Sequence, residues 1–87
     1  MIDNSHRIEL IKVALQSLNP SHLEVIDESY KHIGHEGAKT GLGHFKVVIT
    51  SPQFVGNNRI TNHKAIYATL GDLMHTDIHA LSIVLRK

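Results

Sequence analysis

Apolar residues recur at helical spacing near the start of the chain. Intervals of three or four residues separate Ile8, Ile11, Leu15 and Leu18. This spacing places the four side chains on one face of a helix. Asn4 or Ser5 stands at the capping position, and Asn19-Pro20 ends the pattern. The sequence therefore predicts a first helix with one buried stripe.

Three later segments alternate apolar and polar residues with the period of a strand. The first, from Leu23 to Glu28, has Leu23 and Val25 on one face. The second sets Phe45, Val47 and Ile49 against Lys46 and Thr50. The third divides residues 78–85 into two faces, with His79, Leu81, Ile83 and Leu85 against Ile78, Ala80, Ser82 and Val84.

The segments between the strands have different characters. A long loop after the first strand contains Gly34, Gly37, Gly41 and Gly43, and such long loops are often functional. After the second strand, Ser51-Pro52 predicts a short capped turn that Gly56-Asn57-Asn58 ends. A helix from Thr61 to Met74 follows, with Ile66, Leu70 and Leu73 buried.

The element order is α-β-β-α-β, which predicts a two-layer α/β (α+β) fold in one domain, residues 1–87. The first two strands pair antiparallel, whereas a helix joins the second and third, which therefore pair parallel. Parallel strands start at the same end of a sheet. We therefore expect His79 to lie beside the loop that carries His32 and His35, with His63 near the opposite end.

Composition makes that meeting of histidines relevant to metal chemistry. The 87 residues include eight histidines and no cysteine, so imidazole is the only soft metal ligand the chain offers. The net charge is near +1, so the chain as a whole has no strong positive field to attract nucleic acid or anionic membranes. Without a signal-like or membrane-length apolar run, we expect a soluble, cytoplasmic protein.

Each histidine also has an ordinary structural interpretation. His79 shares the predicted face of Leu81 and Ile83, so it could be a packed strand residue. His32-Ile33-Gly34-His35 could close a metal site, and only one of its two histidines is expected to be a ligand. Alternatively, both histidines could be solvated and bind nothing. We interpret His44 as structural and facing away from His79, His75 as favouring a helix C-terminus, and His6 and His22 as solvated.

The ordered set of motifs over nearly the whole chain resembles the BolA family. The matching residues are Asp27-Glu28-Ser29-Tyr30, His44-Phe45-Lys46-Val47-Val48-Ile49, Ser51, Phe54-Val55-Gly56, His63-Lys64-Ala65-Ile66-Tyr67 with Leu70, and Ile78-His79-Ala80-Leu81-Ser82. The resemblance implies a class II KH-like fold, with a three-stranded mixed sheet and helices on one face. The sequence differs from many relatives in that it ends at Arg86-Lys87 and does not show their Thr-Pro-containing tail.

The resemblance implies a non-enzymatic protein, a monomer when alone, that forms a heterodimer with a monothiol glutaredoxin. The two proteins would share a [2Fe-2S] cluster for iron-sulfur assembly, transfer or iron sensing. Glutaredoxin and glutathione would supply thiolates, and this chain would supply His79 plus His32 or His35. Imidazole ligation would raise the potential of such a cluster. No cofactor is expected on the isolated chain.

Three alternatives remain open at the level of sequence. A DNA-binding transcriptional regulator would use Arg59, His63 and Lys64, although Gly56-Asn57-Asn58-Arg59 lacks the Gly-x-x-Gly clamp of KH modules. A zinc site of His32, His35 and His79 would form without a partner. An enzyme is disfavoured because no nucleophile elbow, phosphate-binding glycine motif or His-Glu-x-x-His pattern is present.

Overall fold

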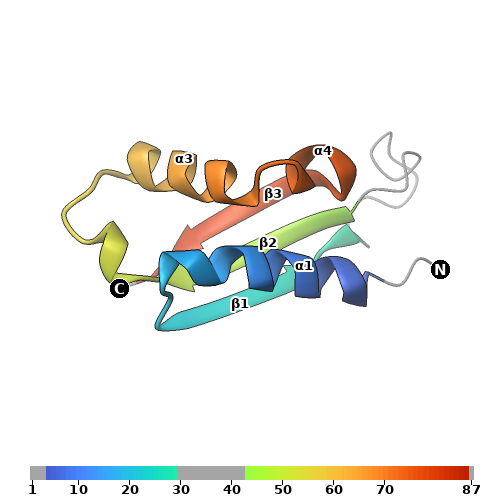
Figure 1. The fold of residues 1–87 in the computed structure, drawn as a ribbon, viewed down its shortest axis with the longest axis horizontal. Coiled ribbons are helices and arrows are strands. Elements are labelled where there is room, and N and C mark those ends of the chain that lie inside the picture. Colours follow the sequence, from blue (N-terminus) through green and yellow to red (C-terminus); the bar gives the residue numbers. More distant parts are fainter. Residues whose placement is uncertain (1–3, 30–42, 87) are drawn as a thin grey trace.

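A central strand rich in apolar residues organises the sheet. In the computed structural model, which describes residues 4–29 and 43–86, β2 (Gly43–Thr50) lies between β1 (His22–Asp27) and β3 (Ile78–Leu85) (Figure 1). β1 pairs antiparallel with β2, and β3 pairs parallel with it. The predicted strand pairing is therefore confirmed, and β2 and β3 start at the same end.

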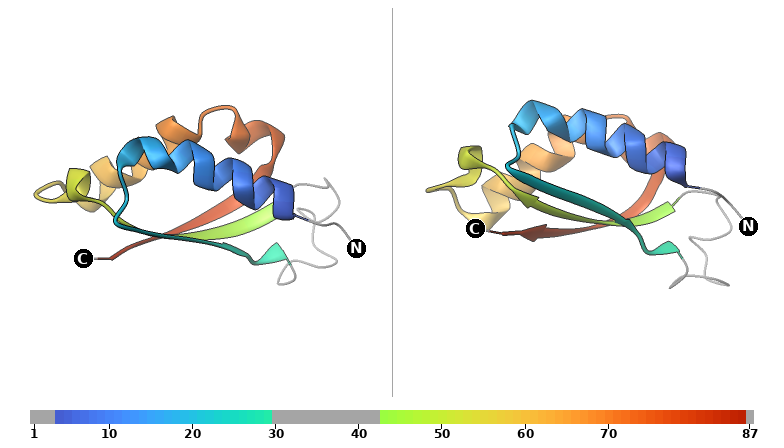
Figure 2. Two further views of the ribbon diagram at one scale, coloured as in Figure 1. Left: turned by 60° about the horizontal axis from the view of Figure 1, so that its bottom comes forward. Right: turned by 90° about the horizontal axis from the view of Figure 1, so that it is seen from below.

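The helices cover one face of this sheet, as Figure 2 shows. α1 (Ser5–Leu15) continues into the 3₁₀ turn η1 (Gln16–Leu18), and η3 (Pro52–Phe54) precedes α3 (Arg59–Leu70) and α4 (Leu73–Thr76). Their apolar stripes meet the sheet in one core made of Ile11, Leu15, Leu18, Phe45, Val47, Ile49, Ile66, Leu70 and Ile78. The two-layer α+β fold with helices on one face is thus confirmed.

The predicted helix from Thr61 to Met74 is wrong at both ends. α3 begins at Arg59, because Asn58 caps it through a 2.8 Å hydrogen bond from the Thr61 N–H to the Asn58 side chain. It stops at Leu70, because Gly71 adopts φ +53°, a conformation that favours glycine. The remaining turn, α4, is a separate element that leads into β3.

A β-bulge interrupts the alternation of β3 at its start. Gly43 pairs with Ile78, whereas the next residue, His44, pairs with Ala80, so β3 has one extra residue there. Ile78 is buried, His79 is exposed, and the inward face resumes at Leu81. The prediction that His79 shares a face with Leu81 is therefore wrong, and the premise for placing His44 opposite His79 fails with it.

Among residues 4–29 and 43–86, no helix combines the length and the hydropathy needed to cross a membrane.

Candidate ligand site at the start of the last strand

His79 lies at an accessible corner of the sheet. It is exposed at the bulge of β3, and β3 is an edge strand because the sheet order is β1-β2-β3. Its neighbour β2 starts at the same end, directly after the segment that carries His32 and His35. Both loop histidines lie outside the described residues. Gly43 starts β2 at this end of the sheet, and Ser29 contacts the neighbouring His44 backbone, so the described residues on either side of that segment are both at this end. The strand ends themselves can be followed in Figure 1.

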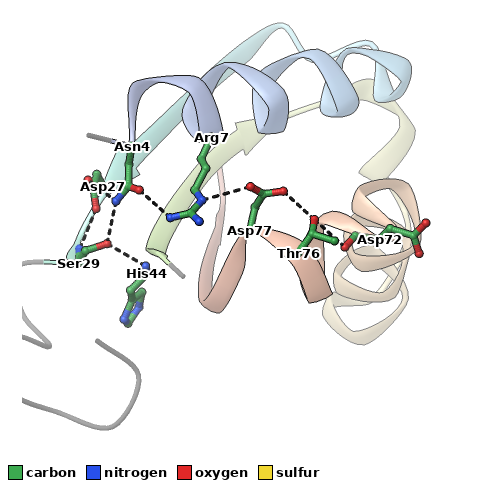
Figure 3. Close-up of polar contacts among 8 residues, drawn as sticks. All are labelled: Asn4, Arg7, Asp27, Ser29, His44, Asp72, Thr76 and Asp77. Atoms are coloured by element: carbon green, nitrogen blue, oxygen red, sulfur yellow. Dashed lines mark hydrogen bonds and ion pairs between the residues drawn. The ribbon is translucent and has the colours of Figure 1, made fainter. Parts of the chain in front are cut away.

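Asn4 joins the start of α1 to the end of β1. Its side chain makes no helix-capping bond. Instead the amide Nδ2 donates to Asp27 Oδ2 at 3.0 Å and to Ser29 Oγ at 3.3 Å (Figure 3). Ser29 Oγ also accepts the backbone N–H of His44 at 3.0 Å. Asn4 is only 6% exposed, so a buried polar contact holds Ser29, the last described residue before the 30–42 segment.

Arg7 extends the same network to the start of β3. Its Nη1 donates to Asn4 Oδ1 and its Nε to Asp77 Oδ1, each at 3.1 Å. The other carboxylate oxygen of Asp77 accepts the Thr76 hydroxyl at 2.6 Å. The backbone carbonyl of Asp77 accepts the N–H of Gly43 at 3.1 Å. The network therefore continues from β1 to the residue two positions before His79 (Figure 3).

Both carboxylates of the network have lowered pKa values. Burial raises the pKa of Asp27, but hydrogen bonds from the Ser29 hydroxyl, the Ser29 N–H and Asn4 together outweigh it. The Thr76 hydroxyl is the largest influence on the pKa of Asp77, and Arg7 lowers it further against a smaller opposing effect of burial. Hydrogen bonds to the charged form favour ionisation. Asp27 and Asp77 are therefore anionic at neutral pH.

The other histidines are dispersed over the described structure. His44 is half-buried on β2, His63 is half-buried in the first half of α3, and His75 is exposed on α4. His22 contacts Glu24 at 2.7 Å on β1. Within 4–29 and 43–86, no three His, Asp or Glu side chains are placed to hold a metal ion. A complete metal site would need ligands from residues 30–42 or from a partner.

Sequence reasoning missed three residues that shape this end of the sheet. Asn4 was interpreted only as a cap, while Arg7 and Asp77 were not singled out. Their partners lie 23 to 70 residues away in sequence, and no local pattern indicates such contacts. The one available signal is that Arg7 borders the apolar stripe of α1 beside Ile8, where a long cation can reach a neighbouring element.

The opposite end of the sheet has a different chemistry. A depression of about 870 Å³ opens where β2 and β3 end, with Thr50, Leu85 and Arg86 among its lining residues. Arg59, at the start of α3, lines it too, and the described residues of the lining include no Asp or Glu. Val55 and Ile60, in the same region, are 82% and 67% exposed. The lining of this depression is mostly apolar and includes two arginines, Arg59 and Arg86.

Comparison with known proteins identifies the family of this chain. A family model described as BolA-like protein matches residues 15–87. The chain belongs to the BolA-like family. It is 40% identical over 75 residues to the Escherichia coli protein named DNA-binding transcriptional regulator BolA, and covers 66% of that protein with 86% of its own length.

Two solved structures resemble this BolA-like chain closely. The BolA domain of SufE1 from Arabidopsis thaliana is 38% identical, with a TM-score of 0.78, over 92% of this chain and 90% of that one. BolA1 from the same plant is also 38% identical, with a TM-score of 0.77, over 99% and 94% of the two chains. The same BolA fold therefore occurs in a domain named after SufE1 and in a BolA1 chain.

Proposed function

We propose that this BolA-like protein is a non-enzymatic partner of a monothiol glutaredoxin, and that the pair shares a [2Fe-2S] cluster with glutathione. The observation that carries the proposal is the position of His79. It is an exposed imidazole at the bulge of an edge strand, next to Ile78, which pairs with Gly43, the first described residue after the segment of His32 and His35. Neutral imidazole is a common metal ligand.

The available donors fit half of a shared cluster. The chain has no cysteine, so it contributes imidazoles and depends on the partner for thiolates. When bound, such a cluster supplies iron and electron-transfer chemistry, and histidine ligation raises its reduction potential. His79 supplies one nitrogen ligand in this proposal, and His32 or His35 supplies the other. Because His79 is exposed, a partner reaches it without opening the core.

Reconstitution with and without the partner tests the proposal. The isolated chain should stay colourless when it is incubated with iron, sulfide and glutathione. An equimolar mixture with a monothiol glutaredoxin should form a heterodimer with the visible absorption of a [2Fe-2S] cluster. A stable cluster on the chain alone, or the absence of a complex with every monothiol glutaredoxin tried, would refute it. Zinc bound by the isolated chain would favour the zinc alternative.

Direct DNA binding is the second candidate function, and the depression lined by two arginines supports it. Arg59 and Arg86 line this depression, with no acidic residue among its described lining residues, and Lys64 is exposed on α3. The E. coli relative is named as a DNA-binding regulator. His63 is half-buried and contributes less exposed surface than Arg59 or Lys64. We rank this candidate second because two or three cations make a small electrostatic footprint.

Binding measured at several salt concentrations distinguishes the two kinds of DNA contact. Nonspecific phosphate contacts give an affinity that falls steeply with salt and depends little on sequence. Sequence-selective binding that persists at physiological salt and is lost in Arg59→Ala or Lys64→Ala would favour the regulator. Lys12→Ala is the control, because Lys12 lies on α1.

A further inference from the structure

We infer that Asn4, Arg7 and Asp77 are positioning residues, which hold the start of β3 and therefore His79 in place relative to Ser29 and Gly43. That these contacts serve metal ligation rests on the proposed function. The contacts themselves join three parts of the chain, the start of α1, the end of β1 and the turn before β3 (Figure 3).

The first step concerns the two residues that flank the segment. Ser29 is held by Asn4 and by the backbone of His44. Gly43 is held by the carbonyl of Asp77. Ser29 and Gly43, the described residues on either side of the segment, are therefore both held by this network.

The second step concerns the link between the outer strands. β1 and β3 are separated by β2 and share no ladder. The chain of contacts from Asp27 through Asn4 and Arg7 to Asp77 connects them through α1 instead. The two outer strands, which could otherwise twist independently about β2, are therefore joined by side chains. Residues that hold a metal ligand in place are commonly worth a large factor in metal affinity.

The third step concerns why arginine is required at position 7. Its Nη1 and Nε donate to two different residues, Asn4 and Asp77. A planar guanidinium donates in two fixed directions at once, whereas a lysine ammonium is a flexible point charge. Arg7→Lys keeps the charge next to Asp77 but loses the fixed link to Asn4. Lysine therefore separates the effect of charge from the effect of geometry.

Two measurements on the same variants test this inference. In the isolated chain, Arg7→Ala should speed amide exchange at Gly43, because the carbonyl of Asp77 that accepts its N–H is no longer held, and should shift the amide signal of His79. In the complex with a monothiol glutaredoxin, it should speed cluster loss about tenfold and change the nitrogen hyperfine coupling of the reduced cluster. Arg7→Lys should restore most of the melting temperature but not the wild-type coupling.

Lys12→Ala is the matched control, because Lys12 is a half-buried cation on the same helix. The inference is overturned if Arg7→Ala matches Lys12→Ala in amide exchange and cluster loss, or if Arg7→Lys restores every readout. If the wild-type mixture binds no cluster, the proposed function fails by itself. Amide exchange at Gly43 then decides alone, with faster exchange in Arg7→Ala supporting the positioning role and unchanged exchange overturning it.

Discussion

Gly43 lies directly against the ring of Phe45. A Cβ atom added at position 43 would come within 2.5 Å of two carbons of that ring. Phe45 has no exposed surface, so its ring cannot move aside into solvent. The first residue of β2 must therefore be glycine for steric reasons, even though its φ is not in the left-handed region.

We predict that Gly43→Ala destabilises the fold by about 1–3 kcal/mol, the usual cost of overpacking a filled core. Thermal and urea unfolding of the isolated chain measure this cost. Phe45→Leu removes the ring and provides the test of cause. In the double variant, the cost of alanine at position 43 should shrink, so the two substitutions should be non-additive. Strict additivity would show that the clash with Phe45 is not the cause.

His79→Ala should leave the fold intact and change the cluster. His79 is exposed, and exposed substitutions typically change stability by less than about 0.5 kcal/mol. The visible spectrum of the complex with a monothiol glutaredoxin should be lost or strongly altered. His75→Ala is the matched control, since His75 is an exposed histidine four residues earlier. A lowered melting temperature with an unchanged spectrum would identify His79 as a structural residue.

The two loop histidines should differ from each other. We expect His32→Ala to perturb the cluster and His35→Ala to be nearly silent, because the resemblance to the BolA family implies a loop ligand at the distance of His32 from Glu28-Ser29. Pulsed EPR of the reduced complex measures this as nitrogen hyperfine coupling from two imidazoles in the wild type and from one in His32→Ala. The reverse result would assign the ligand to His35. Absence of nitrogen coupling in the wild type would refute both assignments.

Acid should weaken the polar network. The pKa values of Asp27 and Asp77 are lower in the folded chain than their usual values, so the folded state binds fewer protons than the unfolded state. The resulting stability is present at neutral pH and is lost as the pH falls below about 4 through the folded-state pKa values. Unfolding free energy measured against pH should therefore decline in this range.

Single substitutions show which carboxylate causes the loss of stability at low pH. Asp77→Asn should lower stability at neutral pH and flatten the decline at low pH, because the ionisable group is gone. Asp72→Asn should keep the wild-type decline, since Asp72 reaches Thr76 through its backbone carbonyl. An unchanged pH profile in both Asp77→Asn and Asp27→Asn would show that other groups determine acid stability.

Local sequence pattern predicts the strands and their pairing but not the details at the site. The alternation of Phe45, Val47 and Ile49 identifies β2 because one face of a half-buried strand must be apolar. The bulge at His79 escapes such reasoning, since one extra residue reverses the faces without any change in composition. The break at Gly71 is hidden because Leu73 and Met74 continue the apolar spacing of α3. The position of the Asn4 side chain depends on contacts with residues that are distant in sequence.

Seventy residues separate Arg7 from Asp77 along the chain. During synthesis, α1 and the first two strands emerge long before β3, and contacts of such high sequence separation form only after a large loop has closed. A nascent chain that stops before residue 77 has neither the partner of Arg7 nor His79. Under the proposed function, a chain without the last strand lacks one iron ligand, so only molecules that include β3 can share a cluster.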